Sequence, residues 1–140
     1  MRPLLTLLGT IPFLITILVL YTQTQWLLLG PSPTVFITTY SSVIISFIAG
    51  RLWGLSLKID GVSASFLFLT SNLITLVAWA TVLFLSIKLI LIAHMILYIV
   101  LLDIDRWLYR QRVIESYQLS ERIMATVLVV IMLGMMILLV

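Results

Sequence analysis

A few polar side chains within long apolar stretches are the first candidates for chemistry in this sequence. The single histidine, His94, lies in one such stretch, and Asn72 lies in the stretch before it. An imidazole can ligate haem iron, but a bis-histidine haem needs two histidines. We therefore expect no cofactor and a neutral, hydrogen-bonded structural His94. Binding of a haem shared with another chain is the weaker alternative for this residue.

A second polar group follows the stretch that contains His94. It has the sequence Asp103-Ile104-Asp105-Arg106-Trp107-Leu108-Tyr109-Arg110. On a continuing helix, Asp103, Arg106 and Arg110 would share one face, because they are spaced by three and four residues. Asp103 and Asp105 would point to different sides, so they are not a ready general acid–base pair. We expect Arg106, Trp107 and Arg110 to form a solvated cap at the membrane–water interface, in contact with anionic headgroups.

A third group surrounds residue 50. Ser42, Ser46 and Gly50 recur every four residues, and small residues at this spacing let membrane helices approach closely. We expect this face to pack inside the chain, with a partner interface as the alternative. Arg51 and Trp53 lie where the helix would reach water, so both are predicted interfacial anchors. Contact of Arg51 with a partner carboxylate, a phospholipid or a quinone headgroup is the alternative.

Established catalytic and metal-binding patterns are missing from the sequence. The chain has no cysteine, which excludes disulfides, cysteine-ligated zinc and iron–sulfur sites. It also lacks the GxxxxGK[ST], HExxH and GxSxG motifs. We therefore expect a protein that is not an enzyme, with no catalytic residues and no metal site.

The composition indicates whether this chain is surrounded by water or by lipid. Of its 140 residues, 63% are hydrophobic and 9% are charged, whereas soluble domains are about 25% charged. A chain this short has too little interior to hide so many apolar side chains from water. Both a soluble globular domain and nucleic-acid binding are excluded, and membrane lipids are the expected surroundings.

The uncharged stretches predict the membrane helices. A span needs about 20 apolar residues, because the hydrocarbon core is about 30 Å thick. We predict one membrane domain over residues 1–140, with a turn near Ser86–Lys88 that spares Lys88 from burial in lipid. The fold class is therefore an all-α, polytopic integral membrane protein with five transmembrane helices. These cover about residues 3–21, 34–57, 63–85, 88–111 and 120–140. The first helix lacks a small-x-small cleavage pattern, so we expect it to be retained.

The basic residues predict the orientation. With five spans, seven of the eight would lie on one side and Lys88 on the other. Basic loops stay on the cytoplasmic or matrix side, which places the N-terminus in and the C-terminus out. The seven are Arg2, Arg51, Lys58, Arg106, Arg110, Arg112 and Arg122.

Three stretches resemble a small membrane-protein family of unknown function that includes transmembrane protein 69 and proteobacterial homologues. Residues 46–54 have the sequence SFIAGRLWG, similar to that family's glycine-rich Trp-Gly signature. The stretch from Ser71 to Trp79 and the Asp105-Arg106 cap are the other two. In this chain Leu52 precedes the tryptophan where the family usually has a basic residue, and Asn72 stands where a proline is typical. The resemblance implies a five-helix protein of a bacterial or mitochondrial inner membrane, and no activity.

Small loops, packing faces and the missing catalytic motifs favour a non-enzymatic role. We expect a structural or accessory subunit of a larger membrane complex, such as a respiratory one, with other membrane-protein subunits as partners. A small oligomeric transporter or channel is one alternative, and a quinone- or haem-binding membrane subunit is another. Neither partner, solute nor oligomeric state follows from the residues.

Overall fold

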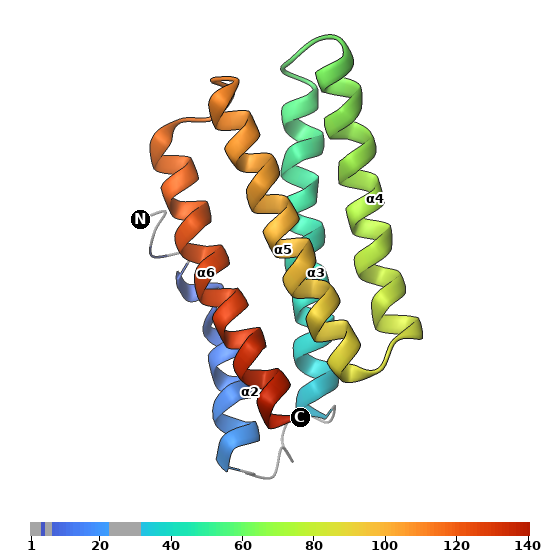
Figure 1. Ribbon diagram of the computed structural model, residues 1–140, viewed down its shortest axis with the longest axis vertical. Coiled ribbons are helices and arrows are strands. Elements are labelled where there is room, and N and C mark those ends of the chain that lie inside the picture. Colours follow the sequence, from blue (N-terminus) through green and yellow to red (C-terminus); the bar gives the residue numbers. More distant parts are fainter. Residues whose placement is uncertain (1–3, 5–6, 23–31) are drawn as a thin grey trace.

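The computed structural model describes residues 4, 7–22 and 32–140, and these form an all-α bundle (Figure 1). Successive helices run in opposite directions, and no strand occurs within the described residues. The helices are α2 (Ile11–Thr22), α3 (Pro33–Ser56), α4 (Val62–Phe84), α5 (Ile87–Arg110) and α6 (Ser116–Leu139).

Four of these helices are long and apolar enough to cross a membrane, namely α3, α4, α5 and α6. Each has 23 or 24 residues. At a rise of about 1.5 Å per residue, each is about 35 Å long and exceeds the hydrocarbon thickness of about 30 Å. The expectation of an all-α, multi-pass membrane protein is therefore confirmed, while its fifth span and its orientation stay predictions.

The first predicted span differs from the structure. Instead of an unbroken helix over 3–21, α2 has 12 residues and follows a turn at Gly9–Thr10. The Thr10 amide donates a hydrogen bond of 3.0 Å to the carbonyl oxygen of Leu7, which closes that turn. Twelve residues reach only about 18 Å, less than the hydrocarbon core. Residues 1–3 and 5–6, where this span would begin, lie outside the described part.

Local signals explain where several helices begin and end. The Val35 amide donates to the Ser32 hydroxyl, and Pro33 takes the first turn of α3, where no amide hydrogen is needed. At the start of α6, Glu115 and Gln118 satisfy each other's backbone amides in a capping box. The predicted break near residues 22–33 falls mostly on 23–31, outside the described residues.

The loops of the bundle divide between its two ends. The α3–α4 and α5–α6 connections lie at one end, and the short α4–α5 connection lies at the other (Figure 1). The helix α4 ends at Phe84 and α5 begins at Ile87, so exposed Lys88 lies in the first turn of α5. Lys88 is thus at the end opposite to Lys58 and Arg112, which lie on the two other connections.

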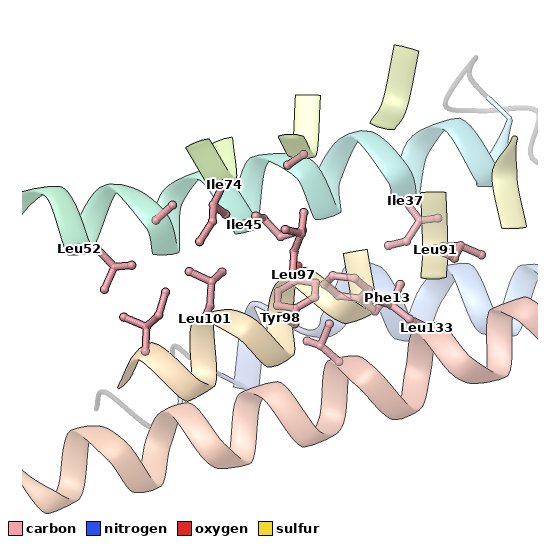
Figure 2. Close-up of a cluster of buried hydrophobic side chains, with 14 of the residues drawn as sticks. Phe13, Ile37, Ile45, Leu52, Ile74, Leu91, Leu97, Tyr98, Leu101 and Leu133 are labelled. Carbon is pink, nitrogen blue, oxygen red and sulfur yellow. The ribbon is translucent and has the colours of Figure 1, made fainter. Parts of the chain in front are cut away.

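The core runs along the middle of the bundle (Figure 2). The helix α3 packs most extensively on α4, and α5 packs on α6. Small buried residues, including Ala49 of α3 with Ser71 and Ala78 of α4, allow a close approach of helix backbones. Large apolar side chains such as Phe47 and Leu69 cover the outside, as a lipid-facing surface requires.

The arrangement predicts which connections share an aqueous compartment. Because the native chain has no cysteine, Asp60→Cys, Ser86→Cys and Gln111→Cys each introduce one exposed thiol. In sealed membranes, an impermeant maleimide should modify positions 60 and 111 from one side and position 86 from the other. Modification of all three from the same side would contradict the bundle.

Candidate functional site

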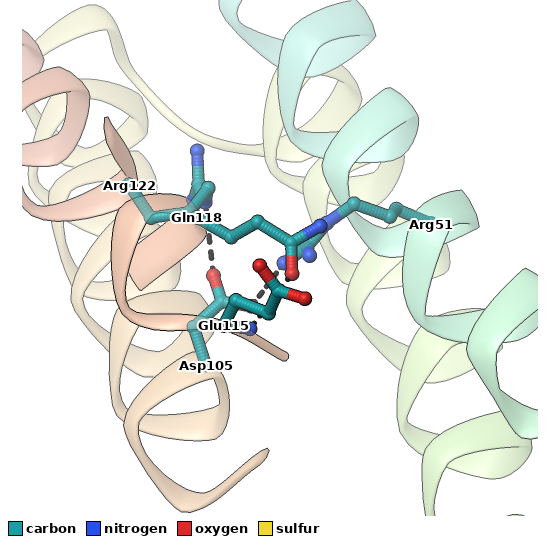
Figure 3. Close-up of polar contacts among 5 residues, drawn as sticks. All are labelled: Arg51, Asp105, Glu115, Gln118 and Arg122. Atoms are coloured by element: carbon teal, nitrogen blue, oxygen red, sulfur yellow. Dashed lines mark hydrogen bonds and ion pairs between the residues drawn. The ribbon is translucent and has the colours of Figure 1, made fainter. Parts of the chain in front are cut away.

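A buried carboxylate joins three helices at the end of the bundle that carries most basic residues. Asp105 of α5 has a fully buried side chain. Its Oδ1 accepts a hydrogen bond from Arg51 Nη2 of α3, and its Oδ2 accepts one of 2.9 Å from Arg122 Nε of α6. Figure 3 shows the two guanidinium groups approaching the carboxylate from different helices. We call Arg51, Asp105 and Arg122 the ion-pair cluster.

Helix periodicity explains why Asp105 faces inward. Tyr98, Leu101 and Leu108 are buried on α5, and Asp105 falls on the same stripe at spacings of three and four residues. The antiparallel order of helices brings the end of α3, the end of α5 and the start of α6 to one level (Figure 1). Three residues far apart in sequence therefore meet.

The charges of the ion-pair cluster do not cancel. Burying a carboxylate costs a large desolvation free energy. Two guanidinium groups offset this cost only if their hydrogen bonds to the carboxylate have good geometry. Asp105 has such geometry, since each of its oxygens accepts from a different arginine. The cluster contains two cations and one anion, so it retains one positive charge. The Nη2 atom of Arg122 is buried and has no hydrogen-bond partner in the described structure.

A second buried polar group surrounds His94 in the membrane interior. Its Nδ1 lies 2.8 Å from the Ser41 hydroxyl of α3, and its Nε2 lies 3.0 Å from the Thr81 hydroxyl of α4. The Ser41 hydroxyl also lies 3.3 Å from the Tyr98 hydroxyl. Both ring nitrogens of His94 are therefore engaged, and the imidazole links three helices. This is the geometry of a structural histidine; haem shared with another chain stays an untested alternative.

Asn72 does not join His94. It is exposed on α4, close to the middle of the helix, and its Nδ2 donates to the Phe68 carbonyl oxygen of the same helix at 2.9 Å. His94, in contrast, has no exposed surface. The two polar residues of the apolar stretches thus lie in different environments.

The face of Ser42, Ser46 and Gly50 is not the buried face of α3. Gly50 is exposed, and a Cβ atom there would meet open space. The neighbouring stripe that includes Ser41 and Ala49 packs inward instead. The expectation that Gly50 packs inside the chain is therefore wrong, because α3 is rotated so that Ser41, which bonds to His94, faces the bundle and Gly50 faces outward. A partner interface on this face stays a prediction.

The predicted interfacial aromatic residues lie near the ion-pair end. Trp53 is 45% exposed, and its ring centroid lies 6.4 Å from that of Phe68. Trp107 packs edge-on against Phe66, with centroids 5.6 Å apart. Both tryptophans thus connect α4 to its neighbours at a depth suited to amphipathic rings.

The cap of α5 divides into an exposed part and a buried part. Arg106 pairs with Asp103 at 3.4 Å, and both side chains are more than half exposed, as is expected of a solvated cap. Arg110 is also exposed. Asp105 and Arg122 were not among the sequence candidates, and Arg51 was predicted as an anchor. The missed signal is the position of Asp105 on the apolar stripe of its helix.

We expect Asp105→Asn to destabilise the bundle strongly. The change leaves two partly buried guanidinium groups, those of Arg51 and Arg122, without the charge of the fully buried Asp105, and breaking a buried pair costs about 3–5 kcal/mol. Thermal unfolding of the purified protein in detergent measures the loss. Asp103→Asn is the matched control, because its exposed pair with Arg106 contributes about 1 kcal/mol or less. Equal effects of the two changes would contradict the structural role of Asp105.

Comparison with known proteins identifies a family without an assigned activity. A family model described as "Protein of unknown function (DUF3429)" matches residues 2–138, nearly the whole chain. No curated protein and no solved structure gives a significant match. The chain, with its apolar helices and buried ion-pair cluster, therefore belongs to the DUF3429 family of proteins of unknown function.

Proposed function

We propose that this protein is a non-enzymatic structural or accessory subunit of a larger membrane complex. A respiratory complex of a bacterial or mitochondrial inner membrane is the setting we favour. The proposal rests on one observation, the exposure of Asn72 at the middle of a membrane helix. We also propose that the chain is related to transmembrane protein 69 and its proteobacterial homologues. The match to a family of unknown function supports this relationship.

An amide at this depth is unfavourable in contact with lipid. Its side chain has two N–H donors and one carbonyl acceptor, and the described structure assigns it one bond, to its own helix. Lipid tails offer no partner for the remaining groups, and an unpaired amide in an apolar medium costs several kcal/mol. Asparagine in membrane helices commonly bonds across to another helix. A second membrane protein against α4 would supply that partner.

The position of α4 leaves it open to such a partner. It lies at the edge of the bundle and packs on α3 and α5 (Figure 1). Around Asn72, the leucines Leu69, Leu73 and Leu76 are 66%, 62% and 59% exposed. A partner helix could therefore cover one continuous apolar face with an amide at its centre.

The buried polar groups favour this role over a transporter. His94 bonds to two neighbouring helices, and Asp105 is neutralised by two arginines. Groups engaged in holding helices together are not available to coordinate a passing solute. The transporter alternative would need a path built from other residues or from several copies of the chain.

Asn72→Leu tests the proposal. The tagged protein is purified from its native membranes in mild detergent, and co-purifying proteins are identified by mass spectrometry. We expect the variant to lose a specific membrane partner at least about tenfold, as the loss of a buried polar contact requires. Thr39→Val is the matched control, because Thr39 is also exposed on a membrane helix and bonds to its own helix.

The thermal unfolding of both variants should match that of the wild type, because both side chains are exposed and the hydrogen bond of each is to its own helix. If the wild-type protein is recovered only as a free monomer, the accessory role is refuted. Recovery solely as a homo-oligomer would favour the transporter alternative instead.

A further inference from the structure

A cavity next to the ion-pair cluster is the strongest unexplained feature of the bundle. It has a volume of about 410 Å³ and lies between α2, α3, α5 and α6. Ligand sites in proteins commonly fall between about 300 and 1,000 Å³. No residue of α4, the helix that carries Asn72, lines the cavity, and α2 and α6 lie on the side of the bundle away from α4 (Figure 1). The cavity is therefore independent of the proposed partner surface.

Two polar atoms without partners belong to residues that line this cavity. Thr126 is 2% exposed, and its hydroxyl has no hydrogen-bond partner in the described structure. The Nη2 atom of Arg122, one helical turn away, is also buried and without a partner. Buried polar groups in proteins are nearly always hydrogen-bonded. Two such atoms on residues that line one cavity point to a ligand that accepts hydrogen bonds.

Apart from Thr10 and Tyr98, the rest of the lining is apolar, and it runs from the interface into the membrane. Arg122 lies at the start of the apolar part of α6, and Val129 lies two turns deeper. Phe13 and Ile44 line the cavity as well, and the first of them is fully buried. Phe47 lines the cavity and is 79% exposed, so the cavity reaches the lipid-facing surface of α3. A ligand can therefore enter sideways from the bilayer.

The positive charge of the site favours an anionic ligand. The ion-pair cluster has one more cation than anions, and the free donor of Arg122 belongs to that surplus charge. Arginine forms strong charge-assisted hydrogen bonds with phosphate and carboxylate groups. A molecule with an acidic head at the interface and a chain in the hydrocarbon matches both the charge and the depth of the cavity.

We propose that this cavity binds an anionic phospholipid, with its phosphate on Arg122 and Thr126 and one acyl chain between Phe13, Ile44 and Val129. The bound phosphate compensates the surplus charge of the ion-pair cluster. The lipid also fills the space between α3 and α6 and so links the short helix α2 to the rest of the bundle.

Native mass spectrometry with defined lipids tests this site. Delipidated protein in detergent is titrated with phosphatidylglycerol or with zwitterionic phosphatidylcholine of the same chains. We expect at least a fivefold preference for phosphatidylglycerol, because its net negative charge offsets the surplus charge of the ion-pair cluster, whereas the choline cation already offsets the phosphate of phosphatidylcholine. Ala125→Phe, which fills the cavity, should lower phosphatidylglycerol binding about tenfold. Val127→Phe, on the exposed face of α6 outside the cavity, should leave binding unchanged.

Thr126→Val keeps the shape of the side chain and removes only the hydroxyl, so it tests the site even if Ala125→Phe fails to fold. It should weaken phosphatidylglycerol about three- to fivefold, because it removes the hydrogen bond from the hydroxyl to the phosphate. Equal binding of both lipids, unaffected by Thr126→Val, would overturn the proposal and indicate non-specific surface lipid. Displacement of phosphatidylglycerol by an equimolar short-chain quinone would overturn it in favour of a quinone site. None of these outcomes depends on the partner of Asn72.

Discussion

The neutralisation of Asp105 is the constraint on which the arrangement of this bundle depends. A carboxylate with no exposed surface, on the buried stripe of α5, is tolerable only with cationic partners in place. Arg51 and Arg122 supply them from α3 and α6. The cluster therefore fixes the rotation and the depth of three helices relative to one another. Apolar side chains alone specify this arrangement weakly, because in lipid they have no hydrophobic driving force to pair.

The two buried polar groups act at different depths of the same bundle. His94 joins α3, α4 and α5 in the interior, whereas the ion-pair cluster joins α3, α5 and α6 near the interface. Together they include all four of the long helices. In lipid the hydrophobic effect does not favour one helix pairing over another, so such polar contacts carry the specificity of the fold.

Much of the fold could be predicted from the sequence, because the positions of charged residues along the chain determine where membrane helices begin and end. The uncharged stretches indicated the four long helices, and the cost of burying Lys88 placed the turn between α4 and α5. The break at Gly9–Thr10 was not predicted, since an apolar stretch such as residues 3–21 does not reveal where its helix is interrupted. The predicted structural role of His94 agrees with its two hydrogen bonds.

The candidate site was harder to predict, because it depends on how helices are rotated. On α3, the faces that contain Ser41 and Ser42 are adjacent, and only the first is buried. The sequence of α3 alone does not indicate which face is buried, because this depends on the helices that pack against it. Asp105 was assigned to a solvated cap with its neighbours, although its position on the stripe of Leu101 and Leu108 indicated burial. The pairing of Arg51 with Asp105 joins residues 54 positions apart, which no local pattern reveals.

Solid-state NMR in lipid bilayers tests the ion-pair cluster most directly. With labelled aspartate carboxyl carbons and arginine guanidinium nitrogens, the account predicts that Asp105 is ionised and gives cross-peaks to two arginines. Arg51→Lys and Arg122→Lys should each remove one of these cross-peaks and so assign them. A protonated Asp105, or a carboxylate without contact to either guanidinium group, would contradict the account.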